Sequence, residues 1–258
     1  MGRVSDLVLM ASLLKVMAGC GQDSGGPADL QAEVSTGQKQ RAFDIVSSAD
    51  YIPWQYNKDG CYARALFMSM ELAAEEIPSS ALYLFGDLQP DPSTIWTFHV
   101  APLVTDSDAG SAVVLDPSLA SHPLTVAEWV SRADREPDES YEYYLTEGSV
   151  YYHQAFGEIR PFSEERSLLA DGHEDFAMVE GFEPLGEFRL ADIFYACHTL
   201  FGYLPESGPG FAERQKRLLD RTRWMLPRLG RFGKLDERWK APLFNIKSCY
   251  DVFRHHSF

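Results

Sequence analysis

The sequence predicts an α+β fold in which a helix packs against an antiparallel sheet. Residues 61–76 carry apolar side chains at helical spacing, whereas residues 81–85 and 95–104 are short runs rich in aromatic and β-branched side chains. A polar loop at residues 105–111 separates the second of these runs from a third at residues 112–116, as in a hairpin. A chain of 258 residues with 45% apolar and 13% aromatic side chains can bury the core that such a fold needs.

The boundaries of these elements follow from their flanking residues. The helix at residues 61–76 should end before Ile77-Pro78, because a residue ahead of proline avoids the α-helical region. Gly86 closes the first strand and Pro117 ends the third. One apolar stripe runs along the helix and consists of Ala65, Met68 and Leu72.

The second half of the chain, residues 125–258, is expected to be mainly helical and either to complete the core or to cover it. Thr125 and Glu128 have the spacing of a capping box at the start of a short helix. The tyrosine-rich residues 141–152 predict a hairpin that turns at Glu147-Gly148. Two further stretches show helical periodicity: residues 190–204 and 211–226.

The N-terminal residues 1–20 have the outline of a secretory signal. The run from Met17 to Cys20 resembles a bacterial lipobox, whose cysteine receives a lipid, and this predicts a secreted or cell-envelope lipoprotein. That lipid is the only membrane contact expected. The alternative is an amphipathic helix with an incidental cysteine. Residues 21–40, rich in Gly, Ser, Asp and Gln, predict a flexible linker that leads into a catalytic core at residues 41–124.

The net charge of −15 argues against nucleic-acid binding, which needs a basic surface. Residues 213–240 depart from this balance, with ten basic and four acidic side chains. Such a stretch is either a solvated helix face or a patch that docks on anionic protein or lipid. The histidines have no metal-ligand spacing, so no metal site is expected.

Cys61 stands at the predicted start of a helix, directly after Asp59-Gly60. Free backbone N–H groups and the helix dipole favour an anion at that point, so a thiol there loses its proton more easily. Gly60 leaves space over the sulfur for a substrate. Cys61 is therefore a candidate nucleophile, and the alternative is a small buried core residue.

His99 lies within a predicted strand, and Asp116 lies at the end of the strand that follows. In a hairpin centred near residue 108, facing positions have numbers that sum to about 216. His99 and Asp116 sum to 215, so in that register they face each other directly. A slip of one residue would separate them, and a bulge can supply the shift. The alternative for His99 is a structural role within the strand.

These three residues suffice for amide hydrolysis. Cys61 attacks the carbonyl carbon, His99 moves the proton, and Asp116 orients the imidazole. The backbone N–H of Cys61 and one side-chain donor would form the oxyanion hole. Gln55 and Trp54 are the candidate donors.

If Cys61 is catalytic and Cys20 carries lipid, two of the four cysteines remain, Cys197 and Cys249. They would form one disulfide in an oxidising compartment. The alternative is two buried free thiols.

Three segments together resemble bacterial protein-glutaminases, which are protein-glutamine deamidases with a papain- and transglutaminase-like core. The segments run from Asp59 to Ala65 (DGCYARA), from Trp96 to Val104 around His99-Val100-Ala101-Pro102, and from Val114 to Ser118 (VLDPS). The resemblance implies that Cys61 is the nucleophile, His99 the base and Asp116 the orienting acid. It also implies hydrolysis of accessible protein-bound or peptide-bound glutamine to glutamate and ammonia, through a thioester and without metal or organic cofactor.

Two other functions compete with deamidation. A transglutaminase-like acyltransferase or a thiol peptidase would form the same kind of acyl-enzyme. The acyltransferase passes the acyl group to an amine instead of water, and the peptidase cleaves a peptide bond instead of a side-chain amide. A non-catalytic surface lipoprotein would keep the fold only as a binding module.

Overall fold

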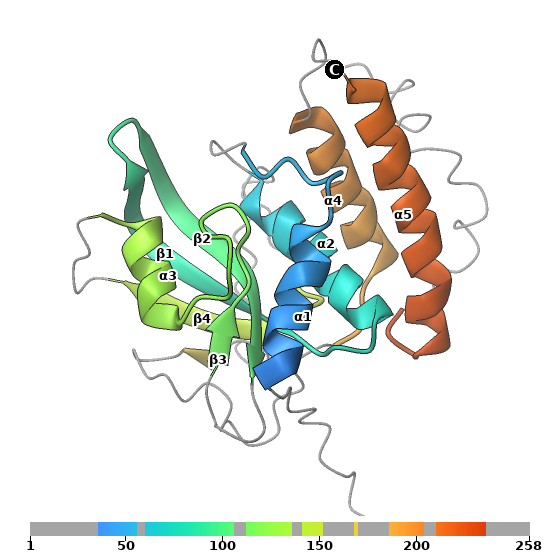
Figure 1. Cartoon of the computed structure of the whole chain (residues 1–258), viewed down its shortest axis with the longest axis horizontal. Coiled ribbons are helices and arrows are strands. Elements are labelled where there is room, and N and C mark those ends of the chain that lie inside the picture. The colour runs from blue at the N-terminus through green and yellow to red at the C-terminus, as the bar shows by residue number, and fades with distance from the viewer. Residues whose placement is uncertain are drawn as a thin grey trace, which may run out of the picture. The chain divides into compact units, whose positions relative to one another are not determined.

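In the computed structural model, five antiparallel strands form a sheet in the order β3-β2-β1-β4-β5 (Figure 1). The structure describes residues 36–55, 60–105, 112–135, 141–151, 168–169, 186–203 and 210–235, all within one unit at residues 31–258. The strands are β1 (Ser80–Asp91), β2 (Thr94–Thr105), β3 (Ala112–Val114), β4 (Glu142–Glu147) and β5 (Leu168–Leu169).

The helix α2 (Cys61–Ala74) lies between the sheet and a layer of other helices (Figure 1). It contacts the sheet mainly through β2, and its other sides contact three helices: α1 (Thr36–Ser47), α4 (Leu190–Tyr203) and α5 (Phe211–Arg231). All residues of α2 are buried, because neighbouring elements surround it. The remaining described helix, α3 (Val126–Ala133), contacts β1 and β3 instead.

Alternate side chains of the central strands point into two separate hydrophobic clusters. Ala81 and Tyr83 of β1 pack with the buried side chains of α2, whereas Leu82 and Leu84 pack with Trp129 of α3. This period of two is expected of a sheet that is covered on both faces. The α2 and α3 helices therefore lie on opposite faces of the sheet.

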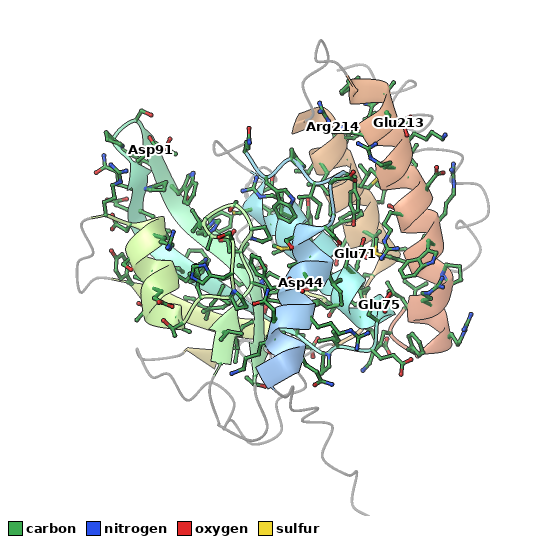
Figure 2. The ribbon with its side chains drawn as sticks, in the orientation of Figure 1. Asp44, Glu71, Glu75, Asp91, Glu213 and Arg214 are labelled. Atoms are coloured by element: carbon green, nitrogen blue, oxygen red, sulfur yellow. The ribbon has the colours of Figure 1, made fainter. Side chains whose placement is uncertain are left out.

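Most predicted elements are present, and the α+β fold with a cysteine-bearing helix against an antiparallel sheet is confirmed. The helix begins at Cys61 and ends at Ala74, before the proline, and Thr125 and Glu128 form the predicted capping box. The strands β1 and β2 are longer than predicted and continue into a hairpin whose tip carries Asp91 (Figure 2).

The hairpin predicted at residues 141–152 is wrong. Residues 142–147 form β4, which pairs with β1 along six residues on one side and with β5 on the other. A tyrosine-rich run indicates a strand, but it does not identify the partner of that strand, which here is β1. The first helix also begins at Thr36, inside the segment predicted as a linker, and buries Ala42, Phe43 and Val46.

The second half of the chain contributes to the same core as the first. β4 is a strand of the sheet, and α4 and α5 pack against α2. Cys197 of α4 is buried and disulfide-bonded, while its predicted partner Cys249 lies outside the described residues. The predicted signal segment, including Cys20, also lies outside them. No helix in the described part of the chain is long and apolar enough to cross a bilayer.

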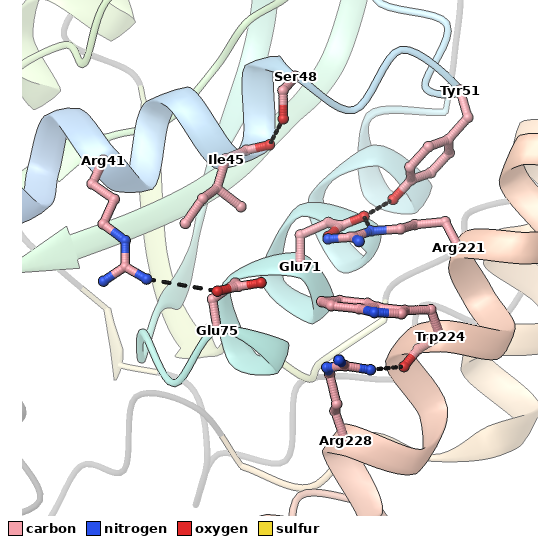
Figure 3. A network of polar contacts seen from close by, with 9 residues as sticks. All are labelled: Arg41, Ile45, Ser48, Tyr51, Glu71, Glu75, Arg221, Trp224 and Arg228. Atoms are coloured by element: carbon pink, nitrogen blue, oxygen red, sulfur yellow. Dashed lines mark hydrogen bonds and ion pairs between the residues drawn. The ribbon is translucent and has the colours of Figure 1, made fainter.

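A buried carboxylate joins α2 to the C-terminal helix (Figures 2 and 3). Glu71 accepts a hydrogen bond of 2.5 Å from the hydroxyl of Tyr51 and two from the Nε of Arg221, at 2.7 and 2.8 Å. The guanidinium groups of Arg221 and Arg228 lie 3.6 and 3.7 Å from the ring centroid of Trp224. Part of the basic stretch predicted from the sequence therefore serves intramolecular contacts.

Candidate active site

Cys61 is the first residue of α2 and follows a glycine with a left-handed backbone. Gly60 has φ 86° and ψ 9°, a conformation that an L side chain rarely adopts. Because the first turn of a helix has N–H groups without intrahelical acceptors, the sulfur stands beside the positive end of the helix dipole. Cys61 is 8% exposed, and it is a free thiol.

His99 lies in the middle of β2, opposite Leu84 of β1, and its side chain is buried. Two indoles stack on the imidazole: Trp96 at a centroid distance of 4.6 Å and Trp129 at 5.5 Å. Strand alternation places His99 on the same face as Ala101 and Leu103, the face that α3 covers. The pairing of β2 with β3 stops at Leu103, so in the described chain no strand from β3 lies beside His99. This open edge allows an imidazole on one face to meet a sulfur on a helix that packs on the other.

Asp116 follows β3 and accepts four hydrogen bonds through its two carboxylate oxygens. Its Oδ2 receives Nε2 of His99 at 2.7 Å and Nε1 of Trp129 at 2.9 Å. Its Oδ1 receives the backbone N–H of Ser118 at 3.1 Å and the hydroxyl of Ser118 at 2.5 Å. A buried carboxylate with this many donors is held in one orientation as an anion.

The predicted contact between His99 and Asp116 exists, but the strands pair in neither the expected register, with sums of about 216, nor the one that would oppose the two residues directly. The observed pairs are Leu103↔Val114, Val104↔Val113 and Thr105↔Ala112, each summing to 217 rather than 215. His99 and Asp116 are therefore diagonal rather than directly opposed. Because the difference is two residues, both side chains keep the same face, and a diagonal pair is within reach of long side chains.

The electrostatics of the pair favour two opposite charges. Burial disfavours the cationic form of His99, but the charge and hydrogen bond of Asp116, together with Cys61, outweigh burial and raise the pKa of His99 to about 9. Burial likewise opposes ionisation of Asp116. The charge and hydrogen bond of His99, with the hydrogen bonds from Ser118 and Trp129, lower the pKa of Asp116 to about 2.

Cys61 lies close enough to His99 to raise the pKa of the imidazole. The sulfur raises the pKa of His99 both as a hydrogen-bond partner and through its charge. The imidazole Nδ1 is buried and has no other partner among the residues that the structure describes, while Nε2 is taken by Asp116. The contact is thus looser than a regular hydrogen bond, which is common in a thiol site without substrate.

The two candidate oxyanion donors differ in their surroundings. Gln55 is exposed, whereas Trp54 is half-buried and packs against the core cluster of α2. The indole Nε1 of Trp54 is buried and has no hydrogen-bond partner in the described part of the chain. An unpaired buried donor is unfavourable unless a ligand uses it, so this group distinguishes Trp54 from Gln55.

Sequence reasoning missed the residues that surround His99 and Asp116, namely Trp96, Ser118 and Trp129. Ser118 follows Asp116 by two, the spacing at which a side chain caps a local turn, and this signal was available. Trp96 precedes His99 by three, which puts side chains on opposite faces of a regular strand. A break in the β1–β2 register at this point accompanies the stacking that is observed. Within the described ranges no cluster of three potential metal ligands occurs.

Comparison with known proteins identifies a family for part of the chain. Residues 33–133 match the sequence profile of a family described as glutaminase, and this segment contains Cys61, His99 and Asp116. The match confirms the predicted resemblance to protein-glutaminases. No curated protein sequence matches the chain.

The solved structures that are similar to this chain include the following three. The NMR structure of protein-glutaminase from Chryseobacterium proteolyticum is 23% identical with a TM-score of 0.42, over 54% of this chain and 82% of that one. A crystal structure of protein-glutaminase is 22% identical with a TM-score of 0.42, over 59% of this chain and 92% of that one. A crystal structure of pro-protein-glutaminase is 25% identical with a TM-score of 0.41, over 55% of this chain and 54% of that one.

Proposed function

We propose that this chain, a member of the glutaminase family over residues 33–133, is a protein-glutamine deamidase that uses Cys61, His99 and Asp116 as its triad. The observation that carries the proposal is the 2.7 Å contact between Nε2 of His99 and Asp116, with Cys61 acting on the same imidazole. That arrangement supplies a nucleophile, a proton carrier and an orienting acid in one place.

In the acylation half-reaction, the sulfur of Cys61, having passed its proton to His99, attacks the carboxamide carbon of a glutamine side chain. His99 carries a proton at neutral pH, because its pKa is raised to about 9, and it gives that proton to the departing nitrogen. The C–N bond breaks, ammonia leaves and a thioester remains on Cys61. Asp116 stabilises the imidazolium before this transfer and keeps the ring in place.

In the deacylation half-reaction, the now neutral His99 accepts a proton from water. The resulting hydroxide attacks the thioester carbon and the C–S bond breaks. The γ-carboxyl of glutamate is released, and the sulfur of Cys61 leaves as a thiolate beside the reprotonated His99, which restores the starting state. No step requires a metal or an organic cofactor.

Both half-reactions pass through an oxyanion. The backbone N–H of Cys61, at the first position of α2, is one donor in this proposal. The indole N–H of Trp54 is the second, because it is buried with no hydrogen-bond partner among the described residues, whereas Gln55 is exposed. Trp54→Phe should lower kcat by about 10- to 100-fold, and Gln55→Ala should leave it near the wild-type value.

The proposal is tested by incubating the protein with an unfolded glutamine-rich protein and measuring ammonia. Cys61→Ser and His99→Gln should each lower ammonia release by at least about 10³-fold. His122→Gln is the matched control, because His122 is exposed and should not affect the rate. Substrate cross-linking to an added amine and substrate cleavage are followed in parallel. Cross-links without conversion of glutamine to glutamate would assign an acyltransferase, because acyl transfer to an amine also releases ammonia. New chain ends would assign a peptidase, and an unreactive Cys61 a binding module.

A further inference from the structure

The indole of Trp129 contacts both the acid and the imidazole of the proposed triad. Its Nε1–H donates to Oδ2 of Asp116 at 2.9 Å, the same oxygen that Nε2 of His99 contacts at 2.7 Å. Its ring also stacks on the imidazole, with an interplanar angle of 27°. One side chain thus contacts both the carboxylate of Asp116 and the ring of His99.

Two local structures place Trp129 at this point. An isolated bridge between Val114 and Leu124, with N–O distances of 2.7 and 3.0 Å, closes the base of the loop that carries Asp116. Directly after the bridge, Thr125 and Glu128 form the capping box that starts α3. Trp129 is therefore the fourth residue of α3, and the bridge and the capping box hold the start of this helix next to β3.

The surroundings of the contact exclude water. His99, Asp116 and Trp129 are all buried, and Trp129 is among the largest side chains with essentially no exposed surface. A hydrogen bond to a charged group in such a medium is stronger than one at the surface. The titratable groups that act on His99 are Asp116 and Cys61.

We propose that Trp129 is a positioning residue of the triad, which holds the carboxylate of Asp116 in line with the imidazole of His99 and shields their contact from water. The hydroxyl and N–H of Ser118 fix Oδ1 of the same carboxylate, but Trp129 fixes the oxygen that faces His99. Without the indole donor, Oδ2 is held by His99 alone and can leave the line of the imidazole. The inference rests on the proposed function for its kinetic readout only.

Two variants remove the donor. Trp129→benzothienylalanine keeps the bicyclic shape and replaces the N–H by sulfur, so packing is preserved. Trp129→Phe removes the donor and also part of the ring. The matched control is Trp224→Phe on α5, because the contacts of that indole in the described part of the chain are with Arg221 and Arg228 rather than with the triad.

The expected result in both Trp129 variants is a roughly 10-fold fall in kcat for a short blocked glutamine peptide, with KM unchanged. The imidazole titration of His99, followed by NMR without substrate, should move to lower pH, because the charge of Asp116 stabilises the imidazolium less. Trp224→Phe should leave both readouts at the wild-type values. The shape-preserving variant keeps the test decisive if Trp129→Phe does not fold.

Wild-type kcat and an unchanged or raised imidazole titration in Trp129→benzothienylalanine would overturn the inference, and Trp129 would then be a core residue only. A wild-type protein that releases no ammonia would refute the proposed function instead. In that case a lowered titration of His99 in the variant would still support the positioning role.

Discussion

Arg221 donates hydrogen bonds through Nε and a terminal nitrogen to the carboxylate of Glu71, which lies 150 residues earlier in the chain (Figure 3). Glu71 is on the helix that begins with Cys61, and Arg221 is on the C-terminal helix α5. The contact joins the two halves of the chain through the helix that carries the proposed nucleophile. It therefore makes α5 part of the same fold as α2 rather than an independent appendage.

Arg221→Gln should destabilise the protein, because it leaves the buried carboxylate of Glu71 without its cationic partner. Loss of one partner of a fully buried pair costs several kcal/mol, but the side chain of Arg221 is 33% exposed and water can replace part of the interaction. We expect the free energy of unfolding to fall by about 2 kcal/mol, measured by urea denaturation.

Arg223→Gln is the matched control for that prediction. Arg223 is on the same helix and pairs with Asp220, but the two side chains are 53% and 55% exposed. An exposed pair contributes little, so this change should stay within about 0.5 kcal/mol of wild type. Equal effects of the two substitutions would show that the Glu71 contact has no special weight.

The sequence was sufficient for elements whose signals are local. Periodicity and the proline after Ile77 located α2 closely, and the spacing of Thr125 and Glu128 identified the start of α3. The contact between His99 and Asp116 was also predicted, because the length of the intervening loop limits the register to a few values. The observed pairs sum to 217 rather than to about 216, since loop length does not determine how the loop is closed.

The remaining parts of the site depend on contacts that no local pattern encodes. Trp129 reaches Asp116 only because Val114 pairs with Leu124 and returns the chain to the end of β3. In the sequence, Glu71 is simply a charged residue within a predicted helix. Its partner Arg221 lies 150 residues further along the chain, so no local pattern indicates the pair. Such relationships are set by tertiary packing, which overrides propensity and periodicity.

Gly148 should tolerate no side chain, because a Cβ at this position would lie 2.3 Å from the backbone oxygen of Ser79. This backbone atom directly precedes β1 and cannot move away cheaply, so Gly148→Ala should lower the free energy of unfolding by about 2 kcal/mol. Gly202→Ala is the control, since nothing lies within 4 Å of its Cβ and it is near the end of α4. This change should stabilise by about 0.5 kcal/mol. Urea denaturation of both variants would reveal the opposite signs, and a neutral Gly148→Ala would contradict the close approach.

The ion pair of His99 and Asp116 should make stability depend on pH in the alkaline range. The folded-state pKa of His99 is raised to about 9 from an ordinary value of 6.5, so the folded protein binds this proton more tightly than the unfolded chain does. The resulting stabilisation is full below pH 6.5 and is lost as pH rises through 9. Its upper limit is about 3 kcal/mol.

The measurement is the free energy of unfolding from pH 6 to 10, for wild type and for His99→Gln. The difference between the two proteins should shrink across the window from pH 6.5 to 9, while His122→Gln should follow wild type throughout. A second loss of folding stability is expected at acid pH. The pKa of Asp116 is lowered to about 2, so its contribution is present above its ordinary pKa of 3.8 and is lost as pH falls toward 2. A difference that stays constant from pH 6 to 10 would contradict the raised pKa of His99.

Deamidation and alkylation of Cys61 should separate at high pH. Ammonia departure needs the proton on His99, so the rate should fall as pH rises through about 9, the pKa of that imidazole. Alkylation of Cys61 by iodoacetamide requires no proton donor and should not fall in the same range. Asp116→Asn should move the alkaline fall in deamidation to lower pH, because the charge of Asp116 raises the pKa of His99. If both rates fell together above pH 9, the cause would be unfolding rather than titration of His99. If the alkaline fall in deamidation stayed at the same pH in Asp116→Asn, His99 would not be the proton carrier.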